Sequence, residues 1–593
     1  NLGDKWADVS EAARGWLPAE SAPRAFAAGD VDGDADTDII ARLASGEIKA
    51  GRNEGGSRNA SVRVQLAGLV SNRSAVGAKI EARAGSLKQK LETYSATPAP
   101  APADVIFGLG KRAAADAIRV IWPAGIVQAE TEIAGDAKRN LKITELDRKP
   151  SSCPYLYAWN GERFEFITDF MGGGEMGYWV APGVRNHIDP DEYVRIRDDQ
   201  LKPRNGRYEI RVTNELEEVL YIDRLQLIAV AHPSDVEVYP NEGLVGPPFP
   251  PFKLYATRGA RPPVAAFDDK GNDVLARISR MDRQYPDDFK LRKIRGYAEE
   301  HTLTLELGHT GDKRALLLLT GWTDYAFSSD NVAAHQAGLA MRPPALQVKN
   351  AKGEWQTVIE NIGIPVGRPQ TMPVDLTGKF LSASREVRIV TNMRVYWDQV
   401  LVDTSDGNFS TRMTRLNPVT AELRWRGFSA EVTPDGREPY GYDYERVSFT
   451  SPWKVFPGRY TREGDVRPLL LRTDDMFVVS RPGDEIALSF DATALPPLPR
   501  GWKRTFLLYS DGYSKEMDIN SASPDQVAPL PFHAMTQYPY RAPEAYPNTP
   551  AHRAYIQRYN TRVVGSPVPA IEAEFAEEVL STAPAAKGQV GNR

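Results

Sequence analysis

The chain has 593 residues, of which 41% are hydrophobic and 25% charged, and its formal net charge at pH 7 is −5. A chain of this length has room for several domains, and its composition is ordinary for a globular protein. The small negative charge argues against a nucleic-acid-binding protein, which would carry a basic patch.

Several absences narrow the class further. No run of about 18 apolar residues occurs, so no membrane-spanning helix is predicted. The single cysteine, Cys153, excludes an intrachain disulfide. Because no Cys/His cluster occurs either, structural zinc, c-type haem and iron–sulfur centres are not expected. The chain begins at Asn1 without a signal peptide, so we expect a mature or incomplete chain.

The first conspicuous motif is an acidic loop. Aspartate occupies every second position from 30 to 38, namely Asp30, Asp32, Asp34, Asp36 and Asp38. An EF-hand needs Gly at loop position 6 and Glu at position 12, but here Gly33 is at position 4 and Ala41 at position 12. Four of the carboxylates and the Asp36 carbonyl can converge on one cation, and oxygen-only ligands select Ca²⁺. The alternative is a solvated acidic turn.

Two strands are predicted after the loop, one beginning at "DII" and a second after "ASGE". A calcium loop between strands resembles the FG-GAP repeat, also called VCBS, of β-propellers. One such repeat is visible, whereas a propeller needs several blades. We therefore predict that residues 1–55 are the last blade of a partial propeller, with the calcium ion pinning its hairpin.

Residues 56–148 carry a second, ordered set of motifs. They comprise Asn72, Gly77, the "FGLG" run at 107–110, the "IRVIWPAG" run at 118–125 and a closing "ITE" at 143–145. This set resembles the ASPIC/UnbV domain, which follows FG-GAP repeats in the cartilage acidic protein (CRTAC) family and its bacterial relatives. The Ala/Pro-rich segment before "FGLG" departs from the family pattern. Phe107 and Trp122 are expected in the core of a small β-sandwich, with a ligand platform as the alternative.

Residues 149–593 contain no nucleotide-binding or hydrolase motif. The Asn160–Gly161 pair predicts a β-hairpin, and residues 328–340 and 551–564 predict helices. We divide this part into a β-rich domain at 149–340, a discoidin-like or jelly-roll-like β-sandwich at 341–495, and a Pro/Tyr-rich tail at 496–593 that drapes over a neighbour. The predicted fold class is therefore mainly β.

Three further motifs are candidate sites. The "MGGGEMG" run at 171–177 indicates a tight turn, because it lacks the Lys-Ser/Thr and helix of a phosphate loop. Asp403, Asp406 and Asn408 form either a second calcium turn or a plain loop. The "NHIDPDEY" run places four polar groups together, either as a metal or acid–base site or as a solvated acidic turn: His187, Asp189, Asp191 and Glu192.

These observations predict a non-catalytic, calcium-binding β protein outside the cytoplasm, whether periplasmic, surface-bound or secreted. It would serve surface binding or adhesion, or be an architectural subunit of a larger assembly, with protein partners or glycan ligands. The alternative is an enzyme that acts on a polysaccharide or natural product through a carboxylate-lined site. The sequence assigns no catalytic residue and no organic cofactor.

Overall fold

The computed structural model describes residues 23–565, except 56–57, 70, 95–103, 124–126, 135–139, 146–153, 311–313, 450–452, 454, 519 and 525. Cys153, Gly125, most of the Ala/Pro-rich segment before "FGLG" and the end of the tail lie outside the described residues. Within the described part, strands predominate, two α-helices occur, and every sheet is open. None of the described helices has the length and hydropathy needed to cross a membrane.

A three-stranded antiparallel sheet begins the described chain, with strand order β1-β2-β3. Its strands are β1 (Pro23–Gly29), β2 (Asp38–Leu43) and β3 (Ile48–Gly51). Gly29 at the end of β1 lies opposite Asp38 at the start of β2. The aspartate loop is therefore the connection between these two strands, and its two ends are held together by the sheet.

Residues 60–144 form two small sheets, of order β10-β4-β7 and β6-β5-β8-β9. Their strands are β4 (Ala60–Ala67), β5 (Lys79–Ala84), β6 (Leu87–Glu92), β7 (Asp104–Gly110), β8 (Ala114–Ile121), β9 (Val127–Ala134) and β10 (Asn140–Thr144). Alternate side chains of β4 and β5 are buried, as expected for strands with one face on a core. Phe107 and Trp122 are at most 1% exposed, so they are core residues, as predicted.

The first large unit has a six-stranded sheet of order β12-β11-β16-β35-β29-β33 and a five-stranded sheet. The second sheet consists of the path β15-β36-β17-β28 and of β34, which pairs with β17. The first sheet contains β11 (Tyr155–Trp159), β12 (Phe164–Asp169), β16 (Arg207–Thr213), β29 (Thr420–Trp425), β33 (Gly464–Asp465) and β35 (Asp484–Asp491). The second contains β15 (Asp191–Ile196), β17 (Glu218–Pro233), β28 (Arg412–Leu416), β34 (Val478–Ser480) and β36 (Trp502–Glu516).

The two sheets of this unit share a core that includes Ile210 and Leu488 from one sheet and Leu227 and Leu508 from the other. The β11–β12 hairpin turns at Gly161, whose φ is +109°, as the Asn-Gly pair predicted. Three smaller ribbons complete the unit: β13 (Trp179–Ala181) with β14 (Val184–Arg185), β30 (Phe428–Val432) with β31 (Gly441–Ser448), and β32 (Gly458–Tyr460) with β37 (Arg562–Val564).

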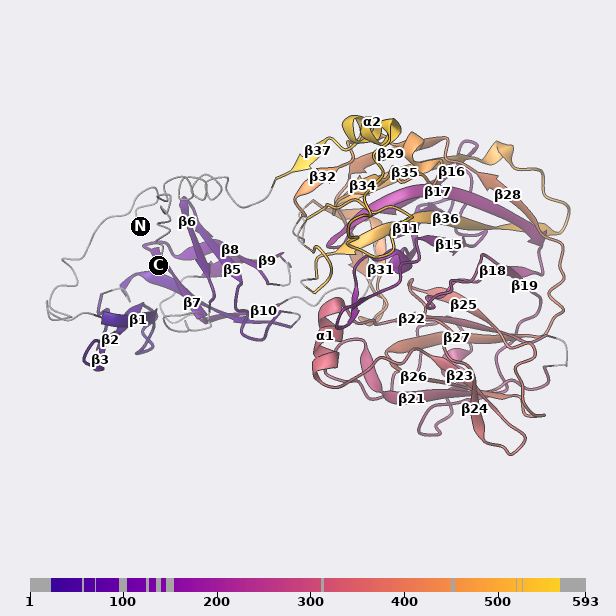
Figure 1. The fold of residues 1–593 in the computed structure, drawn as a ribbon, viewed down its shortest axis with the longest axis horizontal. Coiled ribbons are helices and arrows are strands. Elements are labelled where there is room, and N and C mark those ends of the chain that lie inside the picture. Colours follow the sequence, from indigo (N-terminus) through magenta and orange to yellow (C-terminus); the bar gives the residue numbers. More distant parts are fainter. Residues whose placement is uncertain are drawn as a thin grey trace, which may run out of the picture.

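The second large unit lies between β17 and β28 in the sequence and below the first unit in Figure 1. Its sheets have the orders β20-β21-β26-β23-β24 and β25-β22-β27, and a ribbon pairs β18 with β19. The bounds are β18 (Glu237–Pro240), β19 (Leu254–Thr257), β20 (Ala265–Phe267), β21 (Tyr297–Glu306), β22 (Leu316–Thr323), β23 (Ala345–Lys349), β24 (Trp355–Ile359), β25 (Gln370–Asp375), β26 (Glu386–Met393) and β27 (Val395–Asp403). This unit has a core of its own, including Leu305, Leu317 and Ile389.

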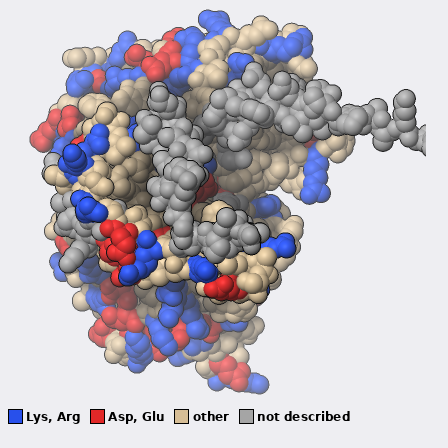
Figure 2. All heavy atoms as spheres, turned by 90° about the vertical axis from the view of Figure 1, so that its left-hand side faces the viewer, with Lys and Arg blue, Asp and Glu red and all other residues tan. Residues whose placement is uncertain are grey.

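A helix forms at both predicted places, but the second ends before the predicted 551–564 segment does, because Arg562–Val564 form strand β37. Helix α1 (Ser328–Gln336) belongs to the second unit, and α2 (Pro550–Arg558) lies at the edge of the first. Short 3-10 turns occur at Gly172–Gly174, Leu275–Ile278, Arg467–Leu470 and Ala492–Ala494. On the face drawn in Figure 2, Lys and Arg side chains are interspersed with Asp and Glu, in agreement with the small net charge.

The sheet pairing divides the chain differently from our sequence-based division. The boundary expected at 340–341 separates β21 from β26, which pair within one sheet. The segment expected to be an irregular tail contains β36, the fifteen-residue strand that pairs with β17. The two differences depend on pairings between residues at least 80 and more than 250 positions apart, respectively, and local composition carries no information about such pairings.

The pairing of Ala231 in β17 with Arg412 in β28 brings the two ends of the second unit together. We predict that replacing residues 234–411 with Asn-Gly leaves the first unit folded, because a tight turn can join these antiparallel strands. The check is a cooperative denaturant transition with a β-type far-ultraviolet spectrum. Removing only 341–411 should abolish cooperative folding, because it deletes β26 and β27 but leaves their partners. Loss of cooperativity in the first deletion would contradict the inserted-unit architecture.

Candidate functional sites

The aspartate loop brings three of its five side chains together. Asp30, Asp32 and Asp38 each offer a carboxylate oxygen, and these oxygens lie within 4.8 Å of one another. Asp34 lies outside this group, and its Oδ1 accepts a hydrogen bond of 3.1 Å from the Asp36 amide. The curvature of the loop places the first, second and last aspartates nearest one another.

Backbone amides hold the loop in this shape. The amides of Gly33 and Ala35 donate to the two oxygens of Asp30, at 2.7 and 3.1 Å. The amides of Val31 and Asn53 donate to Asp38, each at 2.8 Å. The left-handed φ of +84° at Gly33 allows this tight reversal. The orientations of the Asp30 and Asp38 carboxylates are therefore fixed by the backbone.

Two arginines already compensate part of the negative charge. The guanidinium of Arg63 lies 3.0 Å from Asp30, and that of Arg52 lies 3.4 Å from Asp32. A carboxylate oxygen has two lone pairs and can accept a hydrogen bond and bind a cation at the same time. The donor set, oxygen throughout, fits a hard divalent cation such as Ca²⁺.

The second calcium turn considered for residues 403–411 has a different arrangement. The Asp403 carboxylate is buried, and Arg314 Nη1 lies 2.6 Å from its Oδ2. The Ser405 hydroxyl lies 2.8 Å from both of its oxygens. Asp406 instead accepts the Asn408 amide at 3.0 Å. Asp403 is thus occupied by a buried ion pair, which supports the plain-loop alternative.

The four polar residues of "NHIDPDEY" are distributed over two places. His187 lines a mainly apolar cavity of about 450 Å³, whereas Glu192 lines a polar cleft of about 330 Å³ between the two large units. Asp189, Asp191 and Glu192 gather with Glu242 beside this cleft. The Met171 amide donates to Glu192 at 2.6 Å, and the Tyr193 amide donates to Glu242 at 3.0 Å.

These crowded carboxyls hold protons more tightly than usual. Burial, together with the carboxylates of Asp169 and Asp189, raises the pKa of Glu192 to about 8. Burial and the neighbouring Asp191 raise the pKa of Asp189 to about 7. Burial and Glu192 raise the pKa of Glu242 well above its ordinary value. The group can therefore donate and accept protons near neutral pH, which is what general acid–base chemistry needs.

The same cleft presents a buried cation. Arg368 is 2% exposed, and its Nη1 lies 2.7 Å from Glu438. Its guanidinium lies over the Trp322 ring at 4.8 Å. Its Nε and Nη2 find no acceptor among the described residues. A buried guanidinium with unused N–H groups next to carboxyls is suited to a ligand with several hydroxyl or carboxylate oxygens.

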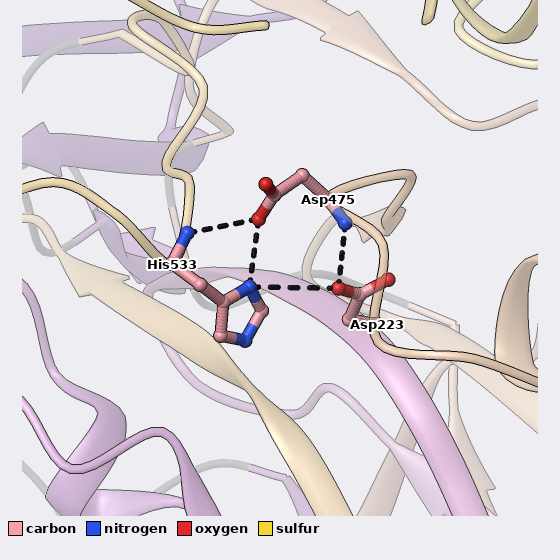
Figure 3. A group of neighbouring side chains, drawn as sticks. All are labelled: Asp223, Asp475 and His533. Carbon is pink, nitrogen blue, oxygen red and sulfur yellow. Dashed lines mark hydrogen bonds and ion pairs between the residues drawn. The ribbon is translucent and has the colours of Figure 1, made fainter. Parts of the chain in front are cut away.

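A fourth cluster was not found from the sequence (Figure 3). His533, in the segment after β36, directs Nδ1 at Asp475 and Nε2 at Asp511, both at 2.7 Å. Asp223 lies 3.7 Å from Nδ1, and its Oδ2 accepts the Asp474 and Asp475 amides at 2.9 and 2.8 Å. One nitrogen of His533 and one oxygen each of Asp223 and Asp475 lie within 4.8 Å of one another, which is close enough for a metal ion.

The hydrogen bonds favour an ion-pair cluster over a metal centre. Both imidazole nitrogens face carboxylate acceptors, so both must carry protons. Although burial opposes the charge, hydrogen bonds to Asp475 and Asp511 raise the pKa of His533 to about 10. The imidazolium thus ties the C-terminal segment to β17, to β36 and to the loop that carries Asp475. Four residues spread from position 223 to 533 left no local signal in the sequence.

This cluster predicts a pH-dependent contribution to stability. The folded pKa of His533 exceeds the unfolded value of about 6.5, so its stabilisation is complete below that pH and is lost as pH rises through about 10. His533→Gln should lower the free energy of unfolding by about 3 kcal/mol at pH 6, because buried carboxylates lose their cation. Denaturant unfolding at pH 6 and pH 10 checks this.

The matched control for that comparison is His309→Gln, because His309 is an exposed histidine. It should change the free energy of unfolding by less than about 0.5 kcal/mol at either pH. An equal loss for His533→Gln at pH 6 and pH 10 would show that the side chain acts by packing and not by charge.

Comparison with known families gives one match. Residues 68–150 match the family described as ASPIC and UnbV, whereas no curated protein matches the chain. The match confirms the ASPIC/UnbV part of the resemblance, with bounds close to the predicted 56–148. The FG-GAP resemblance of residues 1–55 stays a prediction. The chain therefore contains a segment similar to the ASPIC and UnbV family, and the candidate sites described above all lie outside that segment.

Proposed function

We propose that this chain is a non-catalytic, calcium-binding β protein that works outside the cytoplasm in surface binding, adhesion or assembly. The observation that carries the proposal is the convergence of Asp30, Asp32 and Asp38, whose oxygens lie within 4.8 Å of one another. The ligands are those that Ca²⁺ prefers, and the backbone amides orient two of them in advance. Free Ca²⁺ outside the cytoplasm is high enough to fill such a site.

The N-terminal sheet supports a role in assembly. Phe26 on β1 and Ile48 on β3 are 64% and 70% exposed, although both are large apolar residues. Within the described chain, β1 and β3 are also the edges of a sheet of only three strands. Apolar side chains and strand edges of this kind are typical of an element that packs against further strands. We propose that the strands packing against this sheet come from further propeller blades or from a protein partner. We also propose that the paired sheets of the large units are β-sandwiches.

Calcium should stabilise the aspartate loop selectively. We predict that Ca²⁺ increases hydrogen-exchange protection of residues 25–50 over the level in EDTA, because the ion joins the two ends of the loop. Asp32→Asn should weaken calcium binding about tenfold or more, since it removes an exposed ligand whose other contact is a 3.4 Å pair with Arg52.

The control is Glu54→Gln, which removes another exposed partner of Arg52 but lies outside the three-aspartate group. It should leave calcium affinity unchanged when both variants are titrated calorimetrically. Unchanged protection of residues 25–50 in EDTA would rule out the calcium site.

A second candidate function is supported by the polar cleft. An enzyme acting on a polysaccharide or natural product would use Glu192 as a proton donor, because its pKa of about 8 keeps it protonated at neutral pH. Asp191 or Glu242 would serve as the second carboxyl group, and Arg368 would bind an oxygen of the ligand. The cleft is large enough for a sugar ring and has both charged groups and apolar lining.

The direct test is incubation of the protein with a panel of polysaccharides, with products identified by mass spectrometry. If the cleft is catalytic, Glu192→Gln should reduce product formation by about a hundredfold or more. Glu209→Gln should not, because Glu209 pairs with Arg204 and Arg211 outside the cleft. Failure to cleave any polysaccharide, with glycan binding retained, would favour the non-catalytic function.

A further inference from the structure

The mainly apolar cavity of about 450 Å³ lies between the two large units. The first unit contributes residues between 172 and 187 and part of β36, and the second contributes the loops at 244–247, 325–327 and 361–366. Its volume falls within the range of small-molecule sites, which form preferentially between domains. A ligand in this cavity would therefore contact both units.

The walls of the cavity supply an apolar surface. They include Leu244, Val245, Phe327, Met341, Ile364 and Met393. Val180 and Val184 also line the cavity and are 47% and 49% exposed, so it is reached from solvent beside the β13–β14 ribbon. An apolar body that enters leaves water, which supplies affinity without specificity.

The β13–β14 ribbon places one arginine, Arg185, in the lining of this cavity. The ribbon turns at Pro182 and Gly183, and Gly183 has a φ of +74°, a combination typical of a type II turn. The side-chain amide of Asn331 in helix α1 donates to the Trp179 carbonyl at 3.0 Å, which ties the ribbon to the second unit. Arg185 is therefore held at the boundary between the two units.

Two backbone carbonyls orient the Arg185 guanidinium without neutralising it. Its Nη1 donates to the carbonyl oxygens of Gly177 and Asn520, at 3.0 and 2.6 Å. Its Nε and Nη2 make no hydrogen bond with any described residue. Burial lowers the pKa of Arg185, and no carboxylate among the described residues offsets this effect. The guanidinium therefore keeps an unpaired positive charge beside an apolar cavity, because an arginine stays protonated in proteins.

The lining also contains three carboxyl groups, those of Glu175, Glu218 and Glu516. None of them is among the groups that shift the pKa of Arg185. Burial and the charges of Glu516 and Glu218 raise the pKa of Glu175 well above its ordinary value, so Glu175 is uncharged at neutral pH. An anionic group of a ligand would therefore meet the charge of Arg185 at the β14 side of the cavity.

We propose that this cavity binds a small molecule with an apolar body and one carboxylate group, and that Arg185 binds the carboxylate. Nε and Nη2 form one edge of the planar guanidinium, and their N–H groups match the two oxygens of a carboxylate. The apolar lining receives the rest of the molecule. This inference goes beyond the proposed function, since it uses neither the calcium ligands nor the carboxyl groups of the polar cleft.

The test uses the full chain and two probes of nearly equal shape, 4-phenylbutanoate and 4-phenylbutanamide. Calorimetric titration at pH 7.5 should show the carboxylate binding about tenfold or more tightly than the amide, because charge-assisted hydrogen bonds exceed neutral ones. Arg185→Gln should remove this preference and leave amide binding in place. The matched control is Arg459→Gln, which changes an exposed arginine of β32 outside the cavity lining and should keep the preference.

Two further variants cover the case in which Arg185→Gln does not fold. Arg185→Lys keeps the charge but not the two-nitrogen edge, so it should reduce the preference for the carboxylate without abolishing it. Val180→Trp changes a half-exposed residue at the entrance and should weaken the binding of both probes by obstructing entry.

Three results would overturn the proposal. The first is equal affinity for the carboxylate and the amide, or no binding of either. The second is tighter binding of 4-phenylbutylamine than of 4-phenylbutanoate, since the cavity would then select a cation. The third is unchanged affinity for both probes in Val180→Trp, which would place their binding site outside the cavity.

Discussion

The pairing of β17 with β36 is the interaction on which the rest of the large body depends. It runs in antiparallel register from Glu218 opposite Glu516 to Pro233 opposite Trp502, with one shift between Ile222 and Arg224. The two strands run across the upper part of Figure 1. This pair of long strands spans the first unit. The residues at its two ends and at its register shift are therefore held in fixed positions relative to the core.

Each of these three places carries a functional or architectural feature. The register shift leaves Asp223 without a partner on β36 and turns it toward His533 and Asp475, as expected of a β-bulge. One end brings Glu218 and Glu516 together at the apolar cavity. The other end is the point at which the chain leaves to form the second unit. The positions that break the ordinary rules of a paired ribbon are thus the positions of the candidate sites, which is where departures from local consistency are expected.

How much of this the sequence contains depends on how local each feature is. The aspartate loop, the Asn160–Gly161 hairpin and helix α1 depend on neighbouring residues, and their spacing predicted them. The "MGGGEMG" run predicted a tight turn, and a 3-10 turn forms at Gly172–Gly174. The Glu218–Glu516 pair joins residues that are 298 positions apart, and the His533 cluster draws its residues from four separate segments. No short window of sequence therefore shows either arrangement. The inserted second unit escaped prediction for the same reason.

The buried ionisable groups of this protein fall into two classes, which differ in how the free-energy cost of burying them is compensated. Asp403 with Arg314, and His533 with Asp475 and Asp511, are buried groups whose opposite charges are present in the chain. The carboxyl groups of Asp189 and Glu192 instead retain protons near neutral pH. Burial of carboxyl groups without a paired cation costs stability in the absence of a ligand. A proton from solution offsets that cost at Asp189 and Glu192, which separates these carboxyl groups from the buried ion pairs that hold the fold together.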